Sequence, residues 1–210
     1  MSSKPRTSSR RTAPPWRSLR KACAFIRDYD PCGRLGLQGI EVNQSALEFM
    51  NSRLPELIGA IAAEYGIDPG FVTLEITETA ATESFEMLRE SMLALREKGC
   101  RFALDDFGMG YANISQVIRL PFSMVKLDRS LLLGPEAVLE DMARMFARMR
   151  LTTVVEGVET AAQAALAKSI GVDLVQGYYY ARPMRQDDFA AFMERRAAEG
   201  GLRPRRGAAG

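Results

Sequence analysis

The feature that most constrains the fold is a regular alternation of short apolar segments with longer segments of helical periodicity. The apolar segments span residues 37–42, 72–76, 102–104, 124–127, 152–155 and 174–175. The helical segments span residues 16–29, 46–65, 83–98, 112–118, 135–150, 159–169 and 186–198. Strands that alternate with helices favour a parallel sheet, because each crossover helix returns the chain to the same edge. We therefore predict an α/β fold with about six parallel strands and surrounding helices.

Polar side chains stand at or just after the end of each predicted strand. They are Asn43, Glu75, Asp105, Asp106, Lys126, Glu156 and Gln176. In (βα) barrels the carboxyl ends of the strands carry the active site, and packing alone does not explain a ring of polar residues there. The pattern predicts a functional site at this edge of the sheet.

Two adjacent carboxylates, Asp105 and Asp106, follow the apolar run 102–104 and precede a glycine-containing turn at 107–110. Neighbouring carboxylates repel each other, so both stay ionised near neutral pH only if cations or hydrogen-bond donors lie close. One interpretation is a metal site at the end of a buried strand. The other is a solvated turn in which the two aspartates cap the next helix. The residues alone leave both open.

Composition excludes several kinds of chemistry. The chain has no histidine, which excludes Ser-His and Cys-His nucleophiles and imidazole-bound zinc. Its three cysteines show no metal-ligand spacing, and their odd number argues against a disulfide framework, so a reducing cytoplasm is expected. No apolar run approaches the ~20 residues that span a bilayer, and no apolar stretch follows the basic N-terminus as in a secretory signal. Any hydrolysis must use carboxylates, lysine and hard cations.

Basic residues gather at the two ends, whereas the body between them is acidic. We predict a basic disordered tail at 1–15, a domain at 16–198 and a flexible basic tail at 199–210. Such tails could contact nucleic acid or a membrane surface, but solvated ends are the simpler interpretation. We therefore expect no DNA partner and no membrane span.

Six motifs carry a family resemblance. They are VNQS (42–45), LEITET (74–79), ALDDFGMGY (103–111), VKLDRSLL (125–132), VVEGVET (154–160) and DLVQGYYYARPM (173–184). Their order and content resemble the EAL domain family over about residues 16–195. The resemblance implies a modified TIM barrel and a cyclic di-GMP phosphodiesterase that uses two Mg²⁺ or Mn²⁺ ions to form linear pGpG. Some members of that family are inactive binding modules.

The resemblance also implies roles for individual residues. Metal ligands match Asn43, Glu75, Asp105, Asp106 and Glu156, and the catalytic residues match Lys126, Glu156 and Asp106. Gln176, Arg182 and Pro183 match positions near the substrate and the metal-bound water, and Glu78 matches a glutamate that anchors the Asp-Asp loop.

The sequence departs from the family at its start. The family's name-giving glutamate, a metal ligand, lies on a strand before VNQS, and residues 1–15 contain no acidic side chain. We therefore expect an incomplete TIM-like barrel with impaired activity, which needs a homodimer or a complementing protein partner to cover its open edges. The segment between Lys126 and Glu156 is also shorter than the family usually has.

Three interpretations remain open at this point. The chain is a cyclic di-GMP phosphodiesterase whose missing ligand is replaced or dispensable, or it is an inactive module that binds cyclic di-GMP or a protein. The third interpretation is a fragment of a longer EAL protein.

Overall fold

A computed structural model describes residues 16–30, 32–44, 49, 51, 53–77, 85–109 and 114–199. The predicted tail at 1–15, nearly all of the predicted tail at 199–210, and Glu78 lie outside the described residues, so these predictions stay predictions. In the described ranges no helix is both long and apolar enough to cross a membrane.

Six parallel strands form one sheet, and their order in the sheet is their order in the sequence. The strands are β1 (Ile40–Asn43), β2 (Val72–Thr77), β3 (Arg101–Phe107), β4 (Met124–Leu127), β5 (Thr152–Val155) and β6 (Leu174–Val175). In the part of the chain that the structure describes, β1 and β6 each have one hydrogen-bonded neighbour. The sheet is therefore an open half-barrel, which confirms the predicted fold class.

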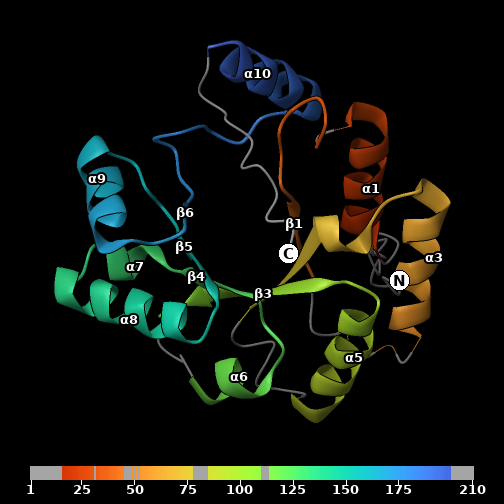
Figure 1. Ribbon diagram of the computed structural model, residues 1–210, viewed down its shortest axis with the longest axis horizontal. Coiled ribbons are helices and arrows are strands. Elements are labelled where there is room, and N and C mark those ends of the chain that lie inside the picture. Colours follow the sequence, from red (N-terminus) through yellow and green to blue (C-terminus); the bar gives the residue numbers. More distant parts are fainter. Residues whose placement is uncertain are drawn as a thin grey trace, which may run out of the picture.

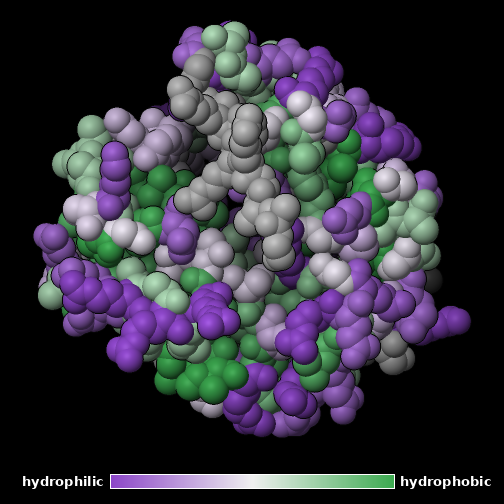
Figure 2. Space-filling view, viewed as in Figure 1, coloured by the Kyte–Doolittle hydropathy of each residue, from purple (hydrophilic) through white to green (hydrophobic). Residues whose placement is uncertain are grey.

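Helices surround the sheet (Figure 1). They are α1 (Arg17–Tyr29), α3 (Leu54–Tyr65), the short η1 (Pro69–Phe71), α5 (Phe85–Glu97), α6 (Ile114–Arg119), α7 (Arg129–Leu132), α8 (Glu136–Arg148), α9 (Ala161–Ile170) and α10 (Gln186–Ala198). On the face seen in Figure 2, hydrophilic side chains predominate around the rim, with apolar side chains visible between them. α10 packs through Ala190 and Met193 against Leu35 and the partly buried Phe25 of α1.

The main core lies between the helices and the sheet. Phe102 and Leu104 of β3 and Val125 and Leu127 of β4 are fully buried, as central parallel strands require. Along β2 the apolar residues Val72, Leu74 and Ile76 belong to this core, and they alternate with the polar residues Thr73, Glu75 and Thr77. The intervening residues of the strand therefore face the inner side of the half-barrel.

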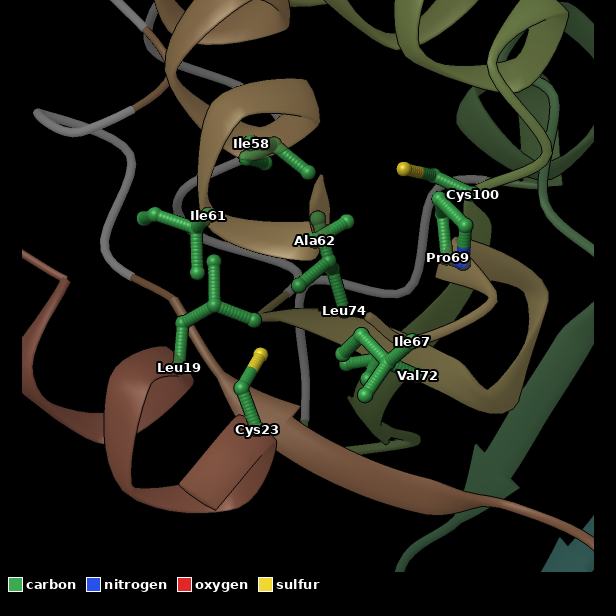
Figure 3. A pocket seen from close by; sticks show the side chains of 10 residues that line it. All are labelled: Leu19, Cys23, Ile58, Ile61, Ala62, Ile67, Pro69, Val72, Leu74 and Cys100. Carbon is green, nitrogen blue, oxygen red and sulfur yellow. The ribbon is translucent and has the colours of Figure 1, made fainter. Parts of the chain in front are cut away.

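One small cavity remains where α1 and α3 meet the sheet (Figure 3). Leu19 and Cys23 of α1 face Ile61 of α3 and Leu74 of β2 across it. Its volume of about 10 Å³ is at the limit for a single water, and its lining is apolar, so it is a packing defect rather than a ligand site. Burial raises the pKa of Cys23 to about 11, so its thiol stays protonated.

The predicted helix at 46–65 is not continuous, although Phe49 within its first part is helical. Asn51 is not helical, Arg53 lies in a turn, and α3 begins at Leu54 with Pro55 in its first turn. Proline has no N–H to donate to the carbonyl four residues earlier, so it begins a helix well and interrupts one poorly. The other predicted helices agree with the structure to within about two residues at each end.

Candidate metal and nucleotide site

The strand register brings the predicted polar residues to one edge of the sheet. Asn43 is paired with Glu75 between β1 and β2, and Thr77 is paired with Asp105 between β2 and β3. Lys126 lies on β4 opposite Val154 of β5, two residues before Glu156. Because all six strands are parallel, their carboxyl ends meet at this edge.

A β-bulge places two successive aspartates near the same point. Leu104 of β3 is paired with Val125 of β4, and Phe107 is paired with Leu127. Two residues of β3 therefore lie between these pairs where β4 has one, so β3 contains one extra residue. Asp106 has a φ of 57°, a left-handed conformation that aspartate tolerates better than most residues. Successive side chains of a regular strand point to opposite faces, and the bulge removes this restriction. Carboxylate oxygens of Asp105, Asp106 and Glu156 consequently lie within 4.8 Å of one another.

Lys126 is the centre of a buried charge cluster, because its side chain is only 5% exposed. Its Nζ atom lies 2.6 Å from Glu75 Oε1, 2.7 Å from Glu156 Oε1 and 3.1 Å from Asp105 Oδ1. A fourth carboxylate, that of Glu41 on β1, lies 3.8 Å from the same nitrogen. One ammonium group therefore stands among four carboxylates.

The cluster shifts the pKa values of its members. Burial opposes the charge of Lys126, but hydrogen bonds with Glu156 and Glu75 and the nearby negative charges outweigh this effect and raise its pKa. Burial raises the pKa of Glu75 to about 7, and a hydrogen-bonding interaction with Glu41 adds to the rise although Lys126 opposes it. The pKa of Glu156 is raised by burial, and that of Asp106 by burial and by the charge of Asp105. The carboxylates around Lys126 therefore carry more negative charge than its single ammonium group neutralises.

The donor set fits a hard divalent cation. The ligand atoms on offer are carboxylate oxygens, which Mg²⁺, Mn²⁺ and Ca²⁺ prefer. In addition, Asp105 Oδ1 is buried and accepts no hydrogen bond of good geometry from any described residue, despite its ion-pair distance to Lys126. A buried, unsatisfied carboxylate oxygen is unfavourable unless a cation binds it.

The remaining predicted residues lie at the margin of this cluster. Asn43 is exposed at the end of β1. Gln176 is exposed and lies with Glu156 and Tyr178 around a hollow of about 320 Å³, which reaches the lower size range of ligand pockets. Arg182 is exposed, its guanidinium 5.0 Å from the centre of the Tyr178 ring, and Pro183 is exposed beside it. The structure thus groups Glu75, Asp105, Asp106, Lys126 and Glu156 tightly. Of the predicted substrate contacts, Gln176 lines an open hollow that shares Glu156 with this group, whereas Arg182 and Pro183 do not line it.

Two residues at the site were not predicted from the sequence. Glu41 lies two residues before Asn43, and this spacing was the available signal, because residues i and i+2 of a strand share a face. Arg129 lines the hollow beside Glu156 and forms a two-point ion pair with Glu159, at 2.7 and 3.1 Å. An arginine directly after the motif VKLD carries no separate signal in a single sequence.

Comparisons with known proteins agree on one family. The family model of the EAL domain matches residues 17–183. RocR of Pseudomonas aeruginosa, named a cyclic di-GMP phosphodiesterase, is 34% identical over 142 residues, which are 65% of this chain and 36% of RocR. The chain therefore spans about a third of the length of this curated relative.

Solved structures give the same result. The EAL domain of Mycobacterium smegmatis DcpA matches with a TM-score of 0.78 at 27% identity, covering 84% of this chain and 82% of that domain. Klebsiella pneumoniae BlrP1, solved as a complex with manganese and cy-diGMP, matches with a TM-score of 0.73 at 27% identity, covering 80% of this chain and 44% of BlrP1. With a family model that matches most of its length and a half-barrel shared with these domains, the chain belongs to the EAL domain family.

Proposed function

We propose that this chain binds cyclic di-GMP at the carboxyl edge of its sheet and hydrolyses one phosphodiester bond with the help of Mg²⁺ or Mn²⁺. The observation that carries the proposal is the convergence of Glu75, Asp105 and Glu156 on Lys126, with Asp106 beside them. Support comes from the printed activity of RocR and from the manganese and cy-diGMP complex of BlrP1.

The carboxylates Glu75, Asp105, Asp106 and Glu156, together with Asn43, are the residues that would hold the cations. A bound pair of divalent cations would lower the pKa of a water molecule and neutralise charge on the reacting phosphate. Without such cations, the carboxylates would repel a substrate that carries two phosphates. The excess negative charge described above is therefore consistent with a site for cations and an anionic substrate together.

Lys126 and the hollow beside Glu156 would contact the substrate rather than the cations. Lys126 keeps its proton at neutral pH, because the surrounding carboxylates raise its pKa, so it can hold phosphate charge or orient the attacking water by donating hydrogen bonds. Gln176, Arg182 and Pro183 would contact the nucleotide. The exposed ring of Tyr178 offers a face for a guanine base in the same hollow.

The direct test is hydrolysis of cyclic di-GMP to pGpG by the purified chain, with Mn²⁺ and Mg²⁺ supplied separately. We expect turnover in the wild type and its loss, by about 10²-fold or more, in the double variant Asp105→Asn, Asp106→Asn. Asp141→Asn is the matched control, because Asp141 is an exposed residue of α8. Binding of cyclic di-GMP without turnover would contradict hydrolysis and indicate a nucleotide receptor.

We also propose that a second copy of the chain covers the open edge at β1. Beside this edge lies an apolar groove of about 430 Å³, lined by residues that include Phe25, Leu37, Ile40, Met184 and Phe189. An unpaired strand edge next to exposed apolar surface is a common site of association. The molar mass of the purified chain, measured by light scattering across a concentration series, tests this; a monomer at all concentrations contradicts it.

A further inference from the structure

Arg129 lies between the strand that carries Lys126 and the loop that carries Glu156. It is the first residue of α7 and follows Lys126 by three residues. Its backbone is fixed there, because Asp128 caps the helix by accepting a hydrogen bond from the Ser130 N–H at 2.8 Å. The side chain of Arg129 therefore starts from an anchored point directly after the strand of the central lysine.

This side chain contacts the loop 156–159 at two places. A Cβ atom on Gly157 would lie 2.7 Å from Cβ of Arg129 and 2.8 Å from its Cγ and Cδ, so the aliphatic part of the arginine rests on the glycine. Beyond the glycine, Nη1 and Nη2 of Arg129 donate hydrogen bonds to the two carboxylate oxygens of Glu159, at 2.7 and 3.1 Å. Arg129 thus spans the loop from the residue after Glu156 to its far end.

We propose that Arg129 is a positioning residue, which holds the loop 156–159 so that Glu156 stays in the charge cluster. This inference rests on the proposed function, because Glu156 is one of the residues that would hold the cations. Arg129 acts through Glu156 and not by contact with the substrate.

The first argument concerns what restrains the chain after Glu156. The backbone N–H groups of Glu156 and Val158 donate hydrogen bonds, each of 3.0 Å, to carbonyls at or just after the ends of β4 and β6. Gly157, between them, has a φ of 68° and forms no backbone hydrogen bond with any described residue. The three atoms nearest to the position of its absent Cβ all belong to Arg129. This contact therefore restrains the most adaptable residue of the loop.

The second argument is the geometry of the ion pair itself. The side chains of Arg129 and Glu159 are 47% and 40% exposed, and ion pairs this exposed contribute little to stability. A two-point contact between a planar guanidinium and a carboxylate nevertheless fixes the orientation of both groups. The pair is therefore better suited to holding the loop in place than to stabilising the fold.

Two competing explanations make different predictions. A merely structural ion pair would change the Tm and leave the affinity for Mn²⁺ unchanged. Direct contact with the substrate, in the hollow that Arg129 lines beside Glu156, would raise KM and leave kcat and the Mn²⁺ affinity unchanged. A positioning role lowers kcat and the Mn²⁺ affinity together, while the Tm of the metal-free protein stays nearly the same.

The experiment compares the wild type with Arg129→Ala by calorimetric titration with MnCl₂, thermal unfolding in EDTA and hydrolysis of cyclic di-GMP. We expect Mn²⁺ to bind about tenfold more weakly and kcat to fall about tenfold or more, with the Tm in EDTA changed by less than about 3 °C. Arg129→Lys keeps the charge without the two-point contact, so its Mn²⁺ binding should remain several-fold weaker than that of the wild type.

Arg20→Ala is the matched control. It removes an ion pair of similar exposure, in which Arg20 of α1 lies 2.7 Å from Glu64 of α3. This variant should bind Mn²⁺ and turn over substrate like the wild type.

Amide hydrogen exchange in EDTA, measured by mass spectrometry, needs neither metal nor substrate. The segment 156–159 should exchange faster in Arg129→Ala and in Glu159→Ala than in the wild type. The double variant should exchange no faster than either single variant, because the two side chains form one contact.

The outcomes are distinct. Wild-type Mn²⁺ affinity and wild-type exchange in Arg129→Ala overturn the positioning role and leave the proposed function in place. A rise in KM alone also overturns it, in favour of direct substrate contact. A wild-type chain that binds no Mn²⁺ overturns the proposed metal centre, whereas hydrogen exchange still decides whether Arg129 holds the loop. If Arg129→Ala does not fold, Arg129→Lys and Glu159→Ala provide the same test.

Discussion

The two sides of strand β2 show how one segment serves two opposite purposes. Val72 and Leu74 face the helices and line the small apolar cavity (Figure 3). Glu75 faces the inner side, and its carboxylate contacts Lys126. Neighbouring residues of the same strand therefore lie in a dry apolar core and in a charged cluster. The apolar side stabilises the fold. The charged side is held in place by ion pairs that all share Lys126. Substitutions on the two sides should consequently differ in what they change.

Replacing the central lysine should have the largest effect. Lys126→Met leaves several partly or fully buried carboxylates without their cation, which should lower the free energy of unfolding by about 3–5 kcal/mol in EDTA. Urea unfolding measures this loss. Lys168→Met, on the exposed surface of α9, is the control and should change stability by less than about 0.5 kcal/mol. A Lys126→Met variant as stable as the control would show that the cluster is not held by this lysine.

Truncating the apolar side should destabilise the chain without affecting metal binding. Leu74→Ala enlarges the cavity between α1, α3 and β2 and should cost about 3 kcal/mol of unfolding free energy. Its Mn²⁺ affinity, measured at a temperature where the variant is folded, should equal that of the wild type. Weakened Mn²⁺ binding by the folded variant would contradict the separation between the two sides of the strand.

The stability of the metal-free protein should fall as the pH rises from about 4.5 to about 7. Glu75 has a pKa of about 7 in the folded chain and an ordinary value of 4.5, so in this range the folded state binds more protons than the unfolded state. The effect of this residue on the free energy of unfolding across this pH range is roughly 3 kcal/mol, and it is removed in Glu75→Gln. Urea unfolding in EDTA at several pH values measures it. An equal slope in the wild type and in the variant would assign the dependence to another group.

The smallest effect concerns the thiols. Cys23 and Cys100 are buried on the apolar side, and burial raises the pKa of each to about 11, whereas Cys32 is exposed. A thiol reagent at pH 8 should label Cys32 quickly and the other two only after unfolding. Mass spectrometry of the labelled chain identifies the sites. Fast labelling of Cys23 in the folded protein would mean that the cavity opens to solvent.

The sequence was sufficient for the sheet and for most of the charge cluster. Apolar runs that end in Glu75, Asp105, Lys126 and Glu156 recur once per strand–helix unit, and a parallel sheet can bring such ends together in only one way. Glu41 escaped prediction because a glutamate inside a short strand ordinarily faces solvent. Its inward orientation follows only once the direction of Asn43 on the same strand is known.

Other details depend on geometry that periodicity does not contain. The predicted continuous helix at 46–65 is interrupted before Leu54, because Pro55 begins a helix at this position rather than continuing one. The hollow around Gln176 forms from a tight turn in which Gly177 lies so close to Val158 that a Cβ atom would be 2.0 Å from its carbonyl oxygen. A single sequence shows the glycine but not the segment that it approaches.

The bulge in β3 makes the number of residues, rather than their identity, the critical property of this strand. One additional residue between Leu104 and Phe107 brings Asp105 and Asp106 to the same cluster. A substitution can remove one of the two carboxylates but cannot restore a regular register. Loss or gain of a single residue here would turn one aspartate to the opposite face while leaving the composition of the strand almost unchanged. Related chains should therefore vary in sequence along this strand more readily than in length.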